Sequence, residues 1–322
     1  MIKTRLCELL DIQAPIIQAA IWPATSPELI AAVGEAGAIG SLGAVFGSAD
    51  GVAAEIDAVR KLTDRPFIVN HVVPQLDEAA FQATLEAKPA AVSFALGDPG
   101  DLVERAHDAG AKVIHQVHTV SQARDAAKRG VDVIIAQGSE AGGQGMAGGV
   151  GAMALVPQVV DAVHPIPVVV AGGVADGRGL AAALVLGAQG ANVGTRFLAS
   201  EEASSAAAWR EQIIAAESED AVRFETWSAF FPPARESAYD VVPRVLRTPF
   251  VERWQGRSDE ARVQADELRS EIMAVVGRRA PHEVVPFTGQ TTGLISEVLP
   301  AGEIVRRMVS EAEEALRSTA EP

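Results

Sequence analysis

Neutral amides and glycines, rather than charged groups, stand where this chain is best placed to do chemistry. Residues 131–137 form an apolar run that ends in Gln137, and the sequence then continues Gly-Ser-Glu-Ala-Gly-Gly-Gln-Gly. Glycine loses more backbone entropy on folding than other residues, so such a cluster usually marks a sharp turn or a close approach to a ligand. We therefore expect residues 138–145 to form a loop at the edge of a binding site.

Two further glycine-containing segments end apolar runs later in the chain. Gly172 and Gly173 follow residues 167–171, and Gly194 with Thr195 ends the run that starts at residue 190. Backbone N–H groups exposed at two such ends, each followed by a helix, form a cradle for a phosphate group. The alternative is that these glycines only allow tight turns.

The elements that position these residues are short apolar runs alternating with segments of helical periodicity, up to about residue 200. Continuous apolar strands joined by helical crossovers indicate a parallel sheet. Eight strands favour a closed (β/α)8 TIM barrel, an α/β fold whose active site lies at the carboxyl ends of its strands. No GxGxxG motif follows the first strand, which argues against a dinucleotide-binding sheet. Strands are expected at residues 15–20, 38–42, 66–70, 90–94, 112–117, 131–137, 167–171 and 190–194.

The pattern changes after residue 200, and we expect three segments. Residues 1–200 form the barrel, residues 201–285 a smaller, mainly helical subdomain inserted after strand eight, and residues 286–322 a segment that returns to the barrel. Four aromatic residues of the subdomain suit either a pocket wall or its core, and their spacing favours the core: Trp227, Phe230, Phe231 and Trp254.

Composition limits the classes of function. The 322 residues are 48% hydrophobic, enough for a large core, and their net charge of −15 argues against nucleic acid as a partner. The single cysteine, Cys7, excludes an internal disulfide, and no signal peptide is evident, so a cytoplasmic protein is expected. No apolar stretch is long enough for a membrane span, and no histidine spacing indicates a metal site. The oligomeric state stays open, a homodimer included.

Several motifs, taken in order, resemble those of the nitronate monooxygenase family, formerly called 2-nitropropane dioxygenases. Residues 136–145 match the glycine-rich segment of this family except at its histidine. The family comprises FMN-dependent barrel enzymes related to flavin-dependent enoyl reductases and to some NADH:quinone reductases. The other matches are residues 15–19, 26–29, 37–43, 66–70, 168–174, 194–197, 289–290 and 293–295.

This resemblance implies FMN bound at the strand ends, with its phosphate on the glycine cradle. It places two alanines and an asparagine near the flavin ring, two glutamines at its polar edge, and the loop glycines close by. Amides suit a flavin independently of the resemblance, because the ring needs hydrogen-bond donors and acceptors but no nucleophile. The implied FMN-binding residues are Ala19, Ala20, Asn70, Gln116, Gln137, Gly142, Gly143, Gly172, Gly173, Gly194, Thr195 and Gln290.

The sequence departs from the family at Gln144, where the family has a histidine that accepts a proton from the carbon next to the nitro group. Imidazole titrates near neutral pH and can serve as a base, whereas an amide cannot. Either another base acts, with His71 after Asn70 the best placed, or the substrate arrives already ionised, or the flavin chemistry differs. Glu140, in the same loop, is expected to order backbone N–H groups rather than to act as a base.

The resemblance thus implies an enzyme, an FMN-dependent oxidoreductase that oxidises alkyl nitronates or nitroalkanes with oxygen. One alternative on the same barrel is an NAD(P)H:quinone or enoyl-thioester reductase. Another is a flavin-binding protein with impaired catalysis, which the missing histidine keeps open.

Overall fold

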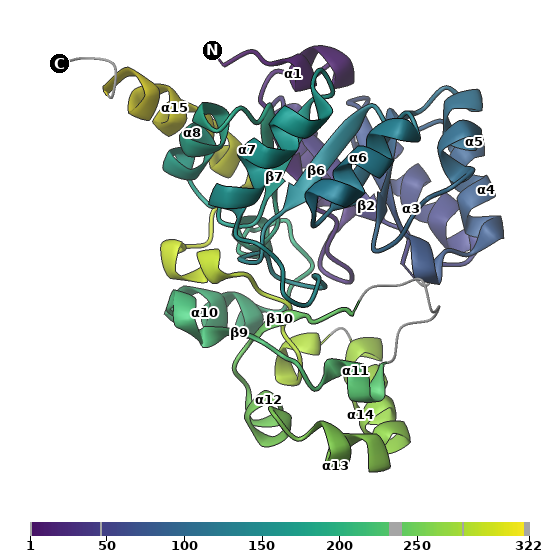
Figure 1. The fold of residues 1–322 in the computed structure, drawn as a ribbon, viewed down its shortest axis with the longest axis vertical. Helices are drawn as coiled ribbons and strands as arrows, with labels where there is room; N and C mark the ends of the chain where they lie inside the picture. Colours follow the sequence, from purple (N-terminus) through teal and green to yellow (C-terminus); the bar gives the residue numbers. More distant parts are fainter. Residues whose placement is uncertain (1, 46, 232–239, 279, 319–322) are drawn as a thin grey trace.

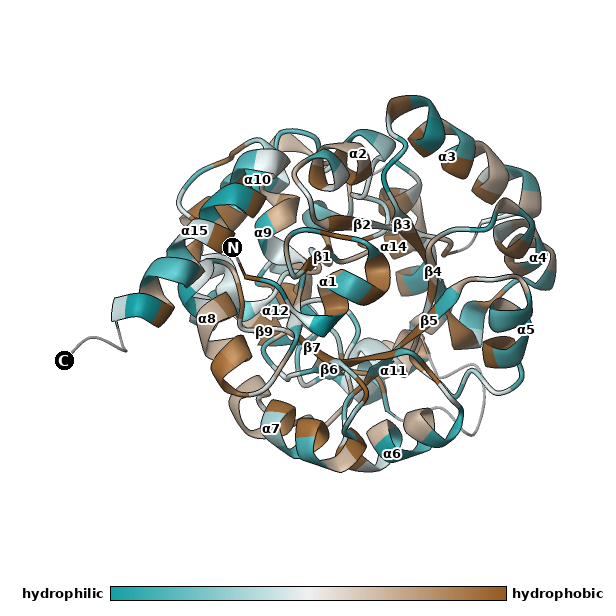
Figure 2. Cartoon of the chain, turned by 90° about the horizontal axis from the view of Figure 1, so that it is seen from above, coloured by the Kyte–Doolittle hydropathy of each residue, from teal (hydrophilic) through white to brown (hydrophobic). Residues whose placement is uncertain are grey.

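Eight parallel strands close into a barrel in the computed structural model, which describes residues 2–45, 47–231, 240–278 and 280–318 (Figures 1 and 2). The ring closes where Ile17 of β1 is in register with Asn192 of β8 and with Ile39 of β2. The predicted (β/α)8 barrel is therefore confirmed. Its strands are β1 (Ile16–Gln18), β2 (Ile39–Gly43), β3 (Phe67–Val72), β4 (Ala91–Ala95), β5 (Lys112–Val117), β6 (Val133–Gln137), β7 (Val168–Ala171) and β8 (Gly190–Val193).

Helices cover the outside of the barrel between successive strands, and polar residues fix where several of them begin. The side chains of Ser26, Asp77 and Asp176 each accept a hydrogen bond from the backbone N–H three residues on, which satisfies a donor that the first helical turn leaves unpaired. These helices are α2 (Pro27–Glu35), α3 (Ala49–Leu62), α4 (Glu78–Ala87), α5 (Leu102–Asp108), α6 (Val120–Lys128), α7 (Ala152–Val163) and α8 (Gly177–Val185).

A short helix before the first strand, α1 (Arg5–Leu10), closes the amino-terminal end of the barrel (Figure 2). Its buried residues Leu6, Cys7 and Leu10 join a core cluster with residues from the strands, among them Ile17 and Ile68. Ligand access to the barrel interior is therefore left to the opposite end, where the strands finish.

Beyond β8 the chain forms a second layer over the carboxyl ends of the strands, on the side of the barrel opposite α1 (Figure 1). We call its described residues between 221 and 287 the cap, since they share a separate apolar core. The cap contains an antiparallel pair of strands that the sequence did not predict. The predicted subdomain also includes residues 232–239 and 279, which lie outside the described residues. The elements of the cap are β9 (Ala221–Arg223), α11 (Trp227–Phe230), β10 (Arg244–Leu246), α12 (Pro249–Trp254), α13 (Ser258–Val263) and α14 (Ala265–Gly277).

Two helices tie this second layer to the barrel, and the last helix returns to the barrel itself. Helices α9 (Thr195–Leu198) and α10 (Ala207–Ala215) contribute Leu198 and Trp209 to a cluster with Ala24 and Ala175 from barrel loops. The last helix, α15 (Ala301–Ser318), packs against α8 and α2. The end of the predicted carboxyl-terminal segment, residues 319–322, lies outside the described residues.

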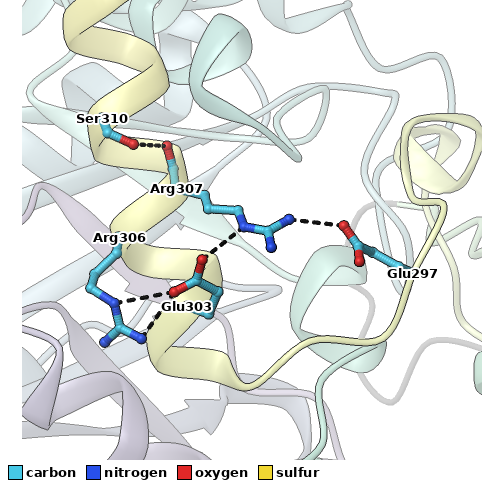
Figure 3. A network of polar contacts seen from close by, with 5 residues as sticks. All are labelled: Glu297, Glu303, Arg306, Arg307 and Ser310. Carbon is cyan, nitrogen blue, oxygen red and sulfur yellow. Dashed lines mark hydrogen bonds and ion pairs between the residues drawn. The ribbon is translucent and has the colours of Figure 1, made fainter.

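Surface ion pairs help to set the start of α15 (Figure 3). Arg307 lies 2.8 Å from Glu303 on the same helix and 2.8 Å from Glu297 in the preceding loop, and Arg306 lies 3.0 Å from Glu303. These pairs are exposed, so each contributes little alone, but Arg307 joins the loop to the helix. No helix in the described part of the chain is both long and apolar enough to cross a membrane.

Candidate functional site

A cavity of about 370 Å³ lies between the carboxyl ends of the barrel strands and the cap. Its volume falls in the range of roughly 300–1,000 Å³ that small-molecule and cofactor sites occupy. Strand ends and the loops that follow them form one wall, and cap residues form the other. Most of the predicted site residues line it: Ala19, Ala20, Asn70, Gln116, Gln137, Gly142, Gly143, Gln144, Gly172, Gly194 and Thr195.

Three predicted site residues are not among those that line the cavity: His71, Gly173 and Gln290. Gly173 follows the cavity-lining Gly172 directly, and its φ of +79° marks a left-handed backbone that favours glycine. Gln290 contributes through its backbone, since its N–H donates to the carbonyl of Glu140 at 2.9 Å and so fixes the glycine loop.

The structure corrects the expected placement of His71. The sequence predicts a strand end at Asn70, whereas β3 continues to Val72, so side-chain alternation turns His71 away from the cavity. Its imidazole packs edge-on against Phe81, and its Nε2 lies 3.0 Å from Thr84 Oγ1. Burial lowers the pKa of His71 to about 4. It is therefore not placed to take a proton from a ligand in the cavity.

The predicted ordering role of Glu140 is confirmed. Its two carboxylate oxygens accept a hydrogen bond from the backbone N–H of Ala152, at 2.9 and 3.0 Å, at the start of α7. The loop also packs tightly against the segment before Gln290, because a Cβ on Gly142 would lie 2.4 Å from the N of Gly289. These contacts hold residues 138–145 in one arrangement beside the cavity.

Arg244 in the cap makes a further contact with this loop, and no local sequence pattern predicts it. Its Nε and Nη2 donate to the carbonyl of Ser139 at 3.1 and 2.8 Å, and its backbone exchanges two hydrogen bonds with Gly143. Burial, and next the nearby Arg223, lower the pKa of Arg244. A buried guanidinium thus joins the cap to the loop that carries Gln144.

The amides near the strand ends divide into two groups. Gln18 is fully buried outside the cavity lining, and its Oε1 accepts from the backbone N–H of Ser41 at 3.1 Å, so it ties neighbouring strands together. Asn70 lines the cavity, and its Nδ2 donates to Ser93 Oγ at 2.8 Å. Ser41 and Ser93 also line the cavity, although sequence reasoning did not select them.

Glutamines 137 and 144 are linked in the cavity wall. The Nε2 of Gln137 donates to the backbone carbonyl of Gln144 at 3.0 Å, which positions the loop at its turn. Among the described residues that line the cavity, Glu140 is the only titratable one, and its carboxylate accepts a hydrogen bond from the backbone N–H of Ala152. The cavity therefore offers many hydrogen-bond donors and acceptors but no group poised as a general base.

The four aromatic residues assigned to the subdomain core separate into two pairs. Phe230 and Trp254 are buried in the cap core, as expected. Trp227 and Phe231 also pack there, as expected, and they line the cavity as well, so both alternatives hold for these two. Helical spacing alone does not distinguish them, because the cavity borders the cap core.

The chain was compared with known families and proteins. The sequence model of a family described as nitronate monooxygenase matches residues 3–311. A probable nitronate monooxygenase of Staphylococcus aureus (strain JH9) is 30% identical over 363 aligned residues, covering 98% of this chain and 99% of the relative. Another from Staphylococcus saprophyticus is 35% identical over 267 residues, which cover 69% and 75% of the two chains.

Two solved structures are similar over nearly the full length. FabK from Thermotoga maritima superposes with a TM-score of 0.89 at 33% identity, covering 99% of both chains. A nitroalkane oxidase from Streptomyces ansochromogenes superposes with a TM-score of 0.84 at 29% identity, covering 98% of this chain and 99% of the other. The likeness thus includes both the barrel and the cap.

Proposed function

Because the chain belongs to the nitronate monooxygenase family, a family of flavin-dependent oxidoreductases, we propose that it is an FMN-dependent enzyme that oxidises alkyl nitronates with oxygen. The family membership makes it an oxidoreductase. The choice of FMN and of the nitronate rests on the chemistry of the cavity.

The residues at the ends of β7 and β8 fit a flavin phosphate. Gly172 has a φ of +88°, and a Cβ there would lie 2.8 Å from the N of Ala141, so the backbone comes close to the loop only because the residue is glycine. The hydroxyl of Thr195 accepts from the N–H of Gly289 at 2.9 Å and still has its own proton to donate. With Gly194, these groups offer donors to a phosphate without a charged side chain.

The remaining polar groups fit a flavin ring and a small anionic substrate. Asn70, Gln116 and Gln137 present amides to the cavity, which match the mixed donors and acceptors of the ring. A flavin held by these residues would supply the redox chemistry, accepting electrons from the substrate and passing them to oxygen. The side-chain amide of Gln144 can donate a hydrogen bond to a nitronate oxygen, but an amide cannot remove a proton.

The observation that carries the choice of nitronate over neutral nitroalkane is the lack of a base in the cavity lining. Glu140 is the one titratable group on that lining among the described residues, and the N–H of Ala152 engages it. His71 points away. A substrate whose carbon has already lost its proton needs no base, and a nitronate meets that requirement.

Anaerobic mixing of the FMN-loaded protein with its substrates tests this proposal. We expect ethylnitronate to bleach the flavin absorbance, and air to restore it with uptake of oxygen. Neutral nitroethane, freshly dissolved at the same pH, should bleach it much more slowly. A protein that stays colourless in the presence of FMN would overturn the flavin assignment. Bleaching of the flavin by NADH but not by ethylnitronate would overturn the proposed monooxygenase activity.

An NAD(P)H-dependent quinone or enoyl-thioester reductase is the second candidate. The apolar side of the cavity, which includes Trp227, Phe231 and Met273, favours it because such substrates carry a large ring or chain. Reduction by NADH followed by reoxidation with a quinone or an enoyl thioester identifies this alternative. If no donor reduces the bound flavin, the protein is a flavin-binding protein without this catalysis.

A further inference from the structure

The two walls of the cavity differ in chemistry. The barrel side presents amides and serines among the apolar side chains of the strands and loops, whereas the cap side, apart from Ser228, presents aromatic and aliphatic side chains. We call these cap residues the apolar wall, and they are Trp227, Phe231, Ile272, Met273, Val276 and Phe287. Apart from the indole N–H of Trp227, no member has a side-chain hydrogen-bond donor. The charged end of a substrate is therefore excluded from this wall, because burying it there leaves its oxygens unpaired.

The apolar wall is built from packed elements. The rings of Trp227 and Phe231 stack with centroids 4.5 Å apart, and the ring of Phe287 meets that of Trp227 edge-on at 5.7 Å. The remaining members, Met273 among them, come from little more than one turn of α14, where residues four apart share a face. The wall is thus a defined surface that includes one flexible methionine, Met273, whose side chain adapts to the shape of its contact.

Two of the apolar residues that line the cavity are also in contact with solvent. Trp22 in the loop after β1 and Met273 on α14 both line the cavity, yet they are 36% and 45% exposed. A chain that lies along the apolar wall as far as Met273 therefore reaches a side chain that is in contact with solvent.

We propose that the apolar wall binds the unbranched alkyl tail of the substrate, so that the preferred substrates are primary nitronates with medium or long chains. This inference rests on the proposed function for the identity of the charged end. Its support is continuity, since one cavity joins the amides around Gln137 and Gln144 to the apolar wall. The ionised end faces the amides, and the tail removes the aromatic and aliphatic surface from water.

The expected size of the effect follows from the burial of methylene groups. Each methylene that leaves water for the wall should tighten binding about fourfold. The gain should stop once the tail passes Met273 and reaches solvent. A series of chain lengths therefore shows a steep rise followed by a plateau.

Alkyl carboxylates provide a non-reactive series, because a carboxylate shares the planar, two-oxygen anionic end of a nitronate. We would titrate butanoate, hexanoate, octanoate and decanoate, below their micelle concentrations, into the FMN-loaded protein and measure Kd by calorimetry and tryptophan fluorescence. Octanoate should bind at least about tenfold more tightly than butanoate. Equal affinities along the series would overturn the inference.

Three variants locate the binding. Met273→Gln places an amide in the apolar wall and should reduce the octanoate-to-butanoate ratio severalfold, and Val276→Phe should move the plateau to shorter chains. Met153→Gln is the matched control, since Met153 is 67% exposed on α7 and lies outside the cavity lining. An unchanged ratio in both cap variants, or an equal change in the control, would contradict the proposed location.

This experiment separates the inference from the proposed function. A rise of affinity with chain length, in a protein whose flavin no nitronate reduces, would overturn the proposed function and retain the apolar tail site. A flat series in a protein that does oxidise ethylnitronate would retain the function and overturn the tail site.

Discussion

Replacing Gln144 by histidine tests the central reasoning about this site, because it supplies the base that the cavity lining lacks. Gln144 is half-buried at the cavity, beside the amide of Gln137. Burial disfavours the charged imidazolium, as it does for His71, whose pKa falls to about 4. A half-buried histidine at position 144 should have a pKa between that value and the usual one of roughly 6.5. At pH 7.5 it is then neutral and able to accept a proton.

The size of the effect depends on the substrate. A positioned general base contributes about 10²–10⁴-fold, and we expect the lower end, about 10²-fold in kcat/KM, for neutral nitroethane. The loop is held in place by Glu140 and Arg244, but nothing preorganises a new imidazole. Ethylnitronate needs no deprotonation, so its kcat/KM should change by less than about fivefold, the value of one neutral hydrogen bond.

Oxygen uptake measured with freshly dissolved nitroethane and with pre-ionised ethylnitronate provides the assay. In the Gln144→His variant, activity on nitroethane should rise with pH through the histidine pKa and level off by about pH 7.5, while activity on ethylnitronate stays nearly flat there. Gln144→Leu is the control, since it removes the amide without adding a base. Equal changes in kcat/KM for both substrates, or no gain in activity on nitroethane in a folded, flavin-loaded variant, would refute the assignment of position 144 as the place of the missing base.

Three further changes test how the site is held together. Arg244→Lys replaces the two-pronged guanidinium by a single ammonium, which cannot reproduce both hydrogen bonds to Ser139. The free energy of unfolding, measured in urea, should fall by about 1.5–3 kcal/mol, and a loss below 0.5 kcal/mol would contradict this role. Glu140→Gln weakens the hydrogen bond with Ala152, so it should lower the free energy of unfolding by about 1 kcal/mol and also weaken FMN binding. An unchanged affinity for FMN would argue against the loop as part of the site. Buried His71 stays neutral in the folded protein but takes up a proton when the chain unfolds. Lowering the pH from 7.5 to 5.5 should therefore reduce the free energy of unfolding by about 1.3 kcal/mol through this residue. In His71→Gln the free energy of unfolding should fall by correspondingly less over the same interval.

The predictions that succeeded depend on local pattern. Strand ends marked by glycine, such as Ala171 before Gly172, were found because a parallel strand buried on both faces reads as a continuous apolar run. The role of Glu140 followed from its place in a glycine loop before a helix, and the structure bears it out. These features need only a few neighbouring residues to be recognised.

The placement of His71 was predicted wrongly because it depends on a small difference of position. Two extra residues in β3 place His71 on the outer face, because successive side chains of a strand point to opposite sides. In the cap, Trp227 and Phe231 pack in the core as expected but also reach the cavity, whereas Phe230 fills the core alone, and the sequence spacing does not show which face meets the barrel.

The sequence by itself determined the barrel and the chemical character of its site. Eight apolar runs, the glycine-bearing strand ends and the amide at position 144 are properties of short segments, and the carboxyl ends of parallel strands must meet at one end of a barrel. The tertiary structure alone decided which cap residues close the cavity and what holds the loop. Arg244 and Ser139 are 105 residues apart, and such a contact exists only after the cap has folded onto the strand ends.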